Sequence, residues 1–173
     1  NASHQMSLSH DEFIGLLHQN ENIIHKICRV YCVALAERED LAQEIIYHLW
    51  KAAKSFDNTY KFSTWMYRVA LNVAISHYRN NKKNVLATPL GDHHLNKAEP
   101  TFDEQEEQVE ELYVFIESLP VLDRALILLY LEGKSYKEIA SVMGISVTNT
   151  GTKINRLKDK LKKHLLTKHK TNG

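Results

Sequence analysis

Between positions 60 and 83, aromatic, amide and basic side chains gather on and just before a predicted helix. One side of this helix carries residues at intervals of three or four: Trp65, Arg68, Asn72, Ile75 or Ser76, and Arg79. The members of this set are Tyr60, Phe62, Trp65, Arg68, Asn72, Arg79, Lys82 and Lys83. Aromatic rings beside a line of cations suit a surface that stacks unpaired bases and neutralises their phosphates. Trp65 and Phe62 could equally anchor the helix in a core, because tryptophan is mostly buried, but Arg68, Asn72 and Arg79 are hard to explain as core residues.

A second set of polar residues lies near the C-terminus, on a helix whose other side carries apolar residues. The polar side consists of Asn149, Thr152, Lys153, Arg156, Lys160 and Lys163. The apolar stripe, which is expected to pack on the domain, consists of Ile154, Leu157, Leu161 and Leu165. Short polar groups followed by basic ones suit contacts first to base edges and then to phosphates. The alternative is a solvated, charged face at the end of a helical bundle.

A short helix, a turn and a long helix are predicted to position the second set. Ser135 and Glu138 have capping-box spacing at the start of a helix that ends near Met143. Gly144 suits a tight turn through the left-handed conformation, and Ser146 caps the final helix. This is the helix-turn-helix pattern, whose second helix enters the major groove when it binds DNA.

A third set forms a polar ridge on a helix predicted over about 39–55, opposite that helix's stripe of leucine and isoleucine. The ridge consists of Asp40, Gln43, Glu44 and Tyr47. Carboxylates would repel DNA, so a functional role for this ridge requires a protein partner with basic groups. A solvated helix face without a partner is the alternative.

The rest of the sequence offers no catalytic or metal centre. Cys28 and Cys32 lie one helical turn apart and are expected to be core thiols, and the ten histidines lack ligand spacing. We therefore predict no enzyme activity, metal, cofactor or small-molecule substrate. No apolar run approaches the ~20 residues that cross a bilayer, and the start does not resemble a signal peptide. These features favour a cytoplasmic protein with no membrane insertion.

Helical periodicity without sustained strand alternation predicts an all-α fold for the 173 residues. A first helical domain is expected over 6–84, with a loop at 56–61 and helices including 22–36 and 63–81. An acidic linker is placed at 85–100, because all three prolines fall in or at the edge of a stretch, 85–117, whose net charge is −8.

The second domain, over 101–173, is predicted to be a four-helix unit that contains the helix-turn-helix. Thr101 and Glu104 have capping-box spacing and open an acidic helix through about Ile116. Residues 121–131 are apolar nearly all round and should form the buried centre of the domain. The net charge of +7 over 118–173 suits a polyanionic partner.

Two segments together resemble a known family. The stretches EDLAQEIIYHLWKAAKSFD (39–57) and FSTWMYRVALNVAISHYR (62–79) look like region 2 of bacterial sigma factors. The stretch LPVLDRALILLYLEGKSYKEIASVMGISVTNTGTKINRLKDKL (119–161) resembles their region 4. Two regions joined by a short linker resemble the compact extracytoplasmic-function (ECF) sigma factors.

The resemblance implies a non-enzymatic subunit that binds core RNA polymerase, recognises the −10 and −35 promoter elements and promotes melting of the duplex. It places Asp40, Gln43 and Glu44 against the polymerase, Arg68 and Asn72 at the −10 element, and a base-capturing loop at 57–63. It also implies that residues 146–156 lie in the major groove of the −35 element. The implied site residues are completed by Ser63 for −10 recognition and by Ser146 and Thr148 for −35 recognition. An anti-sigma factor joins the candidate partners.

The sequence leaves open which residues read bases, and it leaves two alternative functions. Relatives often carry an apolar and then a basic residue where this chain has Thr150 and Gly151, which leaves open which residues read bases. A helix-turn-helix regulator that binds duplex DNA without polymerase is one alternative function, and it predicts a dimer on palindromic sites. A small helical enzyme that uses His77 is a weaker one.

Overall fold

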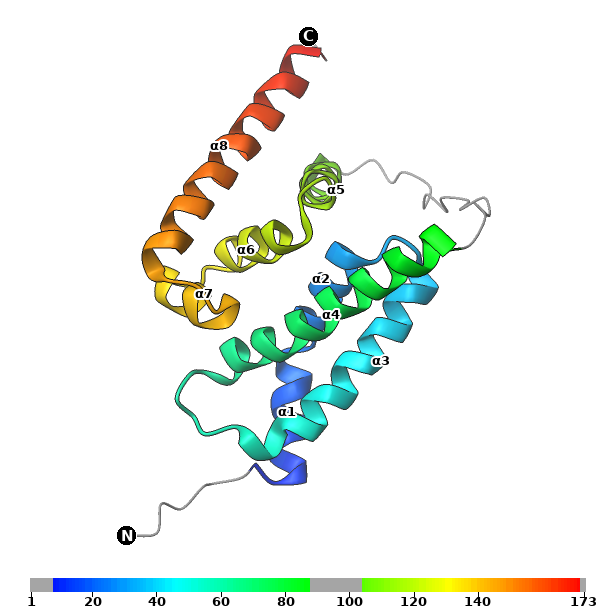
Figure 1. Cartoon of the computed structure of the whole chain (residues 1–173), viewed down its shortest axis with the longest axis vertical. Coiled ribbons are helices and arrows are strands. Elements are labelled where there is room, and N and C mark those ends of the chain that lie inside the picture. Colours follow the sequence, from blue (N-terminus) through cyan, green and yellow to red (C-terminus); the bar gives the residue numbers. More distant parts are fainter. Residues whose placement is uncertain (1–7, 88–103, 172–173) are drawn as a thin grey trace. The chain divides into compact units, whose positions relative to one another are not determined.

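The computed structural model describes residues 8–87 and 104–171, and within them every regular element is a helix. This confirms the predicted all-α class. The chain divides into two compact units, Asn1–Lys97 and Ala98–Gly173 (Figure 1). Among the described residues, no helix is long and apolar enough to cross a membrane.

The first unit contains four α-helices and one short 3₁₀ helix. They are α1 (His10–Gln19), α2 (Glu21–Tyr31), α3 (Leu35–Ala52), η1 (Ala53–Ser55) and α4 (Phe62–Ala87). The Ser9 hydroxyl accepts a hydrogen bond from the Glu12 amide, and the Glu12 carboxylate accepts one from the Ser9 amide, which confirms the predicted start of α1.

Helices α2, α3 and α4 pack against one another to form the core of this unit. Leu41, Ile45 and Leu49 repeat every four residues along α3 and are completely buried. Met66 and Ala70 of α4 are also completely buried. The inward stripes follow the predicted period, so each helix turns its other side toward solvent.

The boundary between α2 and α3 differs from the prediction of one helix over 22–36. Helix α2 ends at Tyr31, and Ala34 is an exposed N-cap residue in extended conformation rather than part of the inward stripe. No glycine or proline marks this break in the sequence. The Arg38 side chain supports the bend, because its Nε donates a hydrogen bond of 2.9 Å to the carbonyl oxygen of Cys32.

Cys28 and Cys32 are buried free thiols, as predicted. Burial raises the pKa of Cys28 to about 12 and that of Cys32 to about 11. The folded chain therefore holds both protons more tightly than the unfolded chain, in which a thiol has a pKa of about 8.5.

We predict that these thiols stabilise the fold fully below about pH 8.5 and progressively less as the pH rises toward 11–12. A Cys28→Val, Cys32→Ala variant should lose less unfolding free energy than the wild type between pH 8 and pH 10.5. Urea unfolding at both pH values measures the difference. Equal losses in the two proteins would contradict the prediction.

The second unit contains α5 (Glu104–Glu117), α6 (Val121–Leu131), α7 (Tyr136–Met143) and α8 (Val147–Thr171). Gly133 and Gly144 both have positive φ, +75° and +67°, at the turns that follow α6 and α7. The Ser135–Glu138 capping box is present. The helix-turn-helix predicted from these residues is therefore confirmed in its local geometry, whereas the Thr101 cap lies outside the described residues.

Helix α6 forms the centre of the second unit and packs against α5, α7 and α8. Residues 125–129 are buried, as predicted, but so is Arg124. Its Nε donates to the carbonyl oxygen of Leu119 and its Nη2 to that of Glu117, at 2.9 and 2.6 Å. The guanidinium thus satisfies carbonyl groups at the end of α5 and fixes the corner between α5 and α6.

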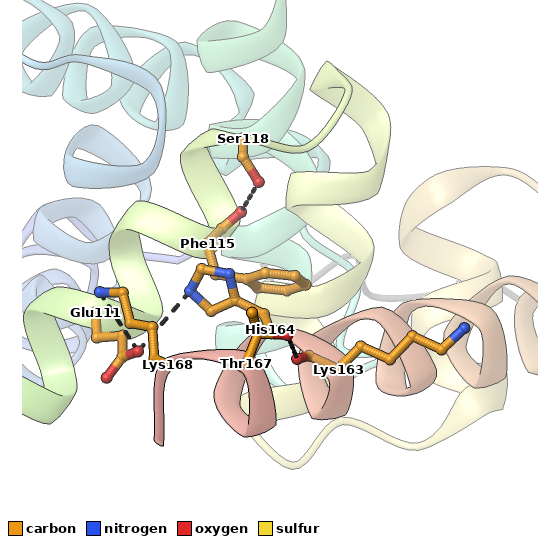
Figure 2. A network of polar contacts seen from close by, with 7 residues as sticks. All are labelled: Glu111, Phe115, Ser118, Lys163, His164, Thr167 and Lys168. Carbon is orange, nitrogen blue, oxygen red and sulfur yellow. Dashed lines mark hydrogen bonds and ion pairs between the residues drawn. The ribbon is translucent and has the colours of Figure 1, made fainter. Parts of the chain in front are cut away.

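A polar and aromatic contact joins α5 to the C-terminal half of α8 (Figure 2). The rings of Phe115 and His164 lie 5.3 Å apart, and Lys168 Nζ lies 3.4 Å from Glu111 Oε1. Glu111 Oε1 and His164 Nε2 lie 4.0 Å apart, which is too long for a hydrogen bond. An ion pair between Glu111 and Lys168 and ring packing between Phe115 and His164 therefore join α5 to α8.

Candidate nucleic-acid and protein interfaces

The loop between η1 and α4 is held in shape by local hydrogen bonds. Asn58 adopts a positive φ of 61°, a conformation that asparagine tolerates better than most residues. The amide of Thr59 donates to Asp57 Oδ1 at 3.0 Å. Hydrogen bonds from the Thr59 side chain and amide hold the pKa of Asp57 below its ordinary value. The turn leads to Tyr60, whose ring is exposed.

Phe62 does not belong to an exposed stacking surface, and this corrects the sequence-based assignment. Its side chain is only 8% exposed. The centre of its ring lies 5.3–6.4 Å from the ring centres of Phe13, Phe56 and Trp65. Trp65 is half-buried, so one part of its ring is in the cluster while another part reaches solvent. Phe62 is therefore a core anchor, whereas Trp65 both packs in the core and reaches the surface at its exposed edge.

The polar members of the set do lie on one exposed side of α4. Arg68, Asn72 and Arg79 are exposed, as are Lys82 and Lys83. Ser63 lies at the start of the helix and is half-buried. The helix extends to Ala87, beyond its predicted end, so both lysines are helical. The result is a continuous basic and amide face that starts beside Trp65.

The predicted ridge on α3 is exposed along its whole length. Asp40, Gln43, Glu44 and Tyr47 all face solvent, and the Tyr47 side chain is 57% exposed. Lys51 Nζ lies 5.2 Å from the centre of the Tyr47 ring. The ridge therefore combines carboxylates, an amide and an aromatic ring, which suits a protein partner with basic and apolar groups.

Three residues next to this ridge were not assigned to it from the sequence. Ile46 and Trp50 of α3 are 40% and 47% exposed and extend the ridge with apolar surface. The i+3 step from Tyr47 to Trp50 was the available signal. The third is His77 of α4, whose Nδ1 lies 3.1 Å from Glu44 Oε2. That contact spans 33 residues of sequence, so no local pattern indicated it.

The first turn of α8 presents short polar side chains to solvent. Ser146 caps the helix by accepting a hydrogen bond from the Asn149 amide at 3.1 Å, and Thr148 and Asn149 are exposed. Thr152 is exposed too, and its hydroxyl donates to the Thr148 carbonyl oxygen. These groups lie at the end of the helix where base-edge contacts occur in helix-turn-helix proteins.

The basic residues follow along α8 as predicted, with two differences in burial. Arg156 and Lys160 are exposed, but Lys153 is half-buried. Ile154 and Leu157 are buried as expected, whereas Leu165 is 38% exposed and leaves the inward stripe. The buried apolar stripe of α8 therefore does not include Leu165, and His164 and Lys168 contact α5 in this half of the helix.

Thr150 is explained by packing, whereas packing does not require glycine at position 151. Thr150 is completely buried, and its hydroxyl donates to the carbonyl oxygen of Ser146 at 2.9 Å. Its polar atom is thus satisfied within the helix, so threonine can occupy a core position. A Cβ on Gly151 would lie 3.5 Å from the ring of Tyr136, an ordinary van der Waals distance.

Because Gly151 has room for a methyl group and lies inside a helix, Gly151→Ala is expected to stabilise the second unit by about 0.5–1 kcal/mol. Urea unfolding measures this change. The matched control is Gly144→Ala, which should destabilise by roughly 1–2 kcal/mol because φ is +67° there. A destabilising Gly151→Ala change would show that Tyr136 cannot tolerate the methyl group.

Comparisons with known proteins match segments of both helical units. The family described as Sigma-70 region 2 matches residues 16–84, and the family described as Sigma-70, region 4 matches residues 110–161. The chain is 30% identical over 167 residues to the ECF RNA polymerase sigma factor SigW of Bacillus subtilis strain 168, covering 90% of this chain and 89% of SigW. It is 33% identical over 141 residues to the RNA polymerase sigma-H factor of Pseudomonas aeruginosa, covering 75% and 73% of the two chains.

Two solved structures share the fold. CnrH, solved in complex with the cytosolic domain of CnrY, aligns with a TM-score of 0.67 and 21% identity over 92% of this chain and 90% of CnrH. The sigma factor RpoE from Bartonella quintana, solved in complex with the anti-sigma factor NepR, aligns with a TM-score of 0.71 and 16% identity over 90% and 97% of the two chains. At these identities the likeness concerns the fold alone.

Proposed function

The chain belongs to the extracytoplasmic-function sigma factors and is therefore an RNA polymerase sigma factor, and from this premise we propose which of its surfaces bind the polymerase and which bind promoter DNA. The duplex-binding regulator that acts without polymerase is not favoured, because the region 2 match accounts for the first helical unit as well. The assignment of individual residues rests on exposure, charge and position.

The exposed face of α4 binds the −10 element as an unpaired strand. The observation that supports this role is the continuous exposure of Arg68, Asn72 and Arg79 beside the half-exposed ring of Trp65. Extruding a base from the duplex costs a few kcal/mol, which stacking and polar contacts must offset. The ordered loop at 57–61 lies next to this face in sequence and is proposed to receive the extruded base.

The first turns of α8 bind the −35 element as a duplex. Thr148, Asn149 and Thr152 are exposed where the helix would enter the major groove, and Arg156 and Lys160 follow at positions suited to phosphates. Helix α6 and the corner fixed by Arg124 hold the recognition helix on the unit. Lys153, which is half-buried, is proposed to reach the backbone with its exposed end.

The ridge on α3 binds core RNA polymerase. Asp40 and Glu44 carry negative charge on a protein that binds DNA, and Tyr47 with Trp50 supplies exposed aromatic area next to them. Aromatic residues are enriched in protein interfaces, whereas carboxylates on a DNA-binding surface would be repelled. The ridge and the α4 face therefore have different partners.

Two further points concern partners and chemistry. An anti-sigma factor is a further proposed partner, because RpoE is similar to this chain in fold and was solved with one. The chain is proposed to act by binding and by stabilising the melted promoter, without a catalytic step of its own. Reconstituted transcription with core RNA polymerase and a matching promoter is the experiment that tests the whole proposal.

Reversal of the ridge charge should separate polymerase binding from folding. Asp40→Lys is expected to weaken binding to core RNA polymerase by about 30-fold, or ~2 kcal/mol, because a charge that faces basic groups is inverted. Fluorescence titration of the labelled full chain with core enzyme measures the change. Glu21→Lys, an exposed reversal on α2, is the matched control. Equal affinities for Asp40→Lys and wild type would remove the ridge from the proposal.

A further inference from the structure

A chain of hydrogen bonds connects the ridge on α3 to the interior side of α4. His77 Nδ1 lies 3.1 Å from Glu44 Oε2, and His77 Nε2 lies 3.0 Å from Asn81 Nδ2. The two contacts use both ring nitrogens of one histidine. They join a carboxylate on the polymerase-binding ridge to a helix whose other side carries the basic face.

His77 occupies a position where the helix would otherwise continue its apolar stripe. Met66, Ala70 and Ala74 are completely buried at intervals of four residues along α4, and His77 and Asn81 follow three and seven residues after Ala74 on the same side of the helix. The His77 side chain is 16% exposed, while that of Glu44 is 45% exposed. The imidazole is therefore placed by helix packing, and the carboxylate lies at the edge where α3 meets both α4 and solvent.

In the neutral imidazole, the partners of His77 decide which ring nitrogen carries the proton. An ionised carboxylate can only accept hydrogen bonds, so Nδ1 carries the proton that is donated to Glu44. Nε2 is then an acceptor and takes its hydrogen bond from the amide of Asn81, which fixes the orientation of that amide. Both ring nitrogens therefore have a partner, and the ring is held between Glu44 and Asn81.

We propose that His77 is a positioning residue for core polymerase binding, because it holds the Glu44 carboxylate in one rotamer with its second oxygen directed to the partner. This rests on the proposed role of the ridge. A glutamate in solvent samples several rotamers, and ordering it on binding costs affinity. The hydrogen bond from His77 imposes that order in the free protein, so less is lost when the polymerase binds.

The expected effect is selective. His77→Leu removes the Nδ1 N–H donor and replaces the imidazole with an apolar side chain of similar length. This variant should weaken binding to core RNA polymerase by about three- to tenfold. His77→Asn keeps an N–H donor near the position of Nδ1, and it should restore binding to within about twofold of wild type. A merely structural role would not distinguish these two variants in this order, because leucine suits a partly buried helix position better than asparagine.

A double-mutant cycle with Glu44→Gln tests the proposal through affinity for core RNA polymerase, measured with the full chain. Glu44→Gln and His77→Leu should each weaken binding, and the double variant should be no weaker than the worse single variant. His25→Leu, a change at an exposed histidine of α2, is the matched control. Thermal unfolding of every variant reports separately on the fold.

Three results would overturn the proposal in distinguishable ways. Additive losses for His77→Leu and Glu44→Gln would show that His77 does not act through Glu44. Equal weakening by His77→Leu and His77→Asn would show that the donor is irrelevant. If Asp40→Lys weakens binding while Glu44→Gln does not, the proposed role of the ridge stands and the His77 proposal fails. If neither variant weakens binding, the proposed role of the ridge itself fails.

Discussion

Removal of the polar groups from the centre of the α4 face, by Arg68→Ala together with Asn72→Ala, is expected to reduce promoter opening by about 100-fold while core polymerase binding is unchanged. A charge-assisted hydrogen bond contributes about 1.5–3 kcal/mol and a neutral one roughly 1 kcal/mol. Both side chains are exposed, so their removal costs little folding free energy. The loss should therefore appear in the open complex rather than in the fold.

The measurement is open-complex formation with core RNA polymerase, followed by permanganate reactivity of unpaired thymines and by run-off transcription. The matched control is Asn22→Ala with Lys54→Ala, which removes one exposed amide and one exposed cation from other helices. A pre-melted promoter bubble adds a second comparison. Because the variant still lacks contacts to the unpaired strand, the bubble should recover only the part of the loss that is due to melting. Full activity of the Arg68, Asn72 variant on duplex promoters would refute the assignment of the α4 face.

Phe62→Ala is expected to destabilise the first unit by about 3–5 kcal/mol, the range for removal of a large buried aromatic side chain. The ring is 8% exposed and contacts the rings of Phe13, Phe56 and Trp65. Its loss would leave a cavity at the point where α1, the 56–61 loop and α4 meet. Urea unfolding monitored by tryptophan fluorescence measures the change, since Trp65 adjoins the cavity.

The control for this prediction lies two residues away. Tyr60→Ala should change unfolding free energy by less than about 0.5 kcal/mol, because the ring is exposed. The same variant is expected to weaken promoter opening if the loop receives a base. Similar stabilities for Phe62→Ala and the wild type would return Phe62 to the exposed stacking set.

The parts of the fold that could be predicted are those whose cause lies within a few residues of sequence. Ser9 with Glu12 and Ser135 with Glu138 begin helices because each pair satisfies two backbone amides locally. Gly133 and Gly144 end helices because they adopt positive φ without steric cost. The exposed ridge and the basic faces also follow from local spacing, because one helix has one period.

The parts that could not be predicted depend on contacts between distant residues. Helical spacing assigned Phe62 and Trp65 to the same set, but only the packing of α1 and the 56–61 loop against α4 decides that one is buried and the other half-exposed. The break between α2 and α3 lies earlier in the chain than predicted, because no glycine or proline marks its position and the Arg38 side chain supports it.

The sequence alone therefore determined the all-α class, the helix caps at Ser9 and Ser135 and the family, since each depends on local energies or on residue order. Tertiary structure alone decided that Phe62 is buried while Trp65 is half-buried, that Thr150 is a core residue, and that His77 contacts Glu44 across 33 positions. The physical reason is that burial and long-range hydrogen bonds are properties of how helices pack, and no single helix carries that information.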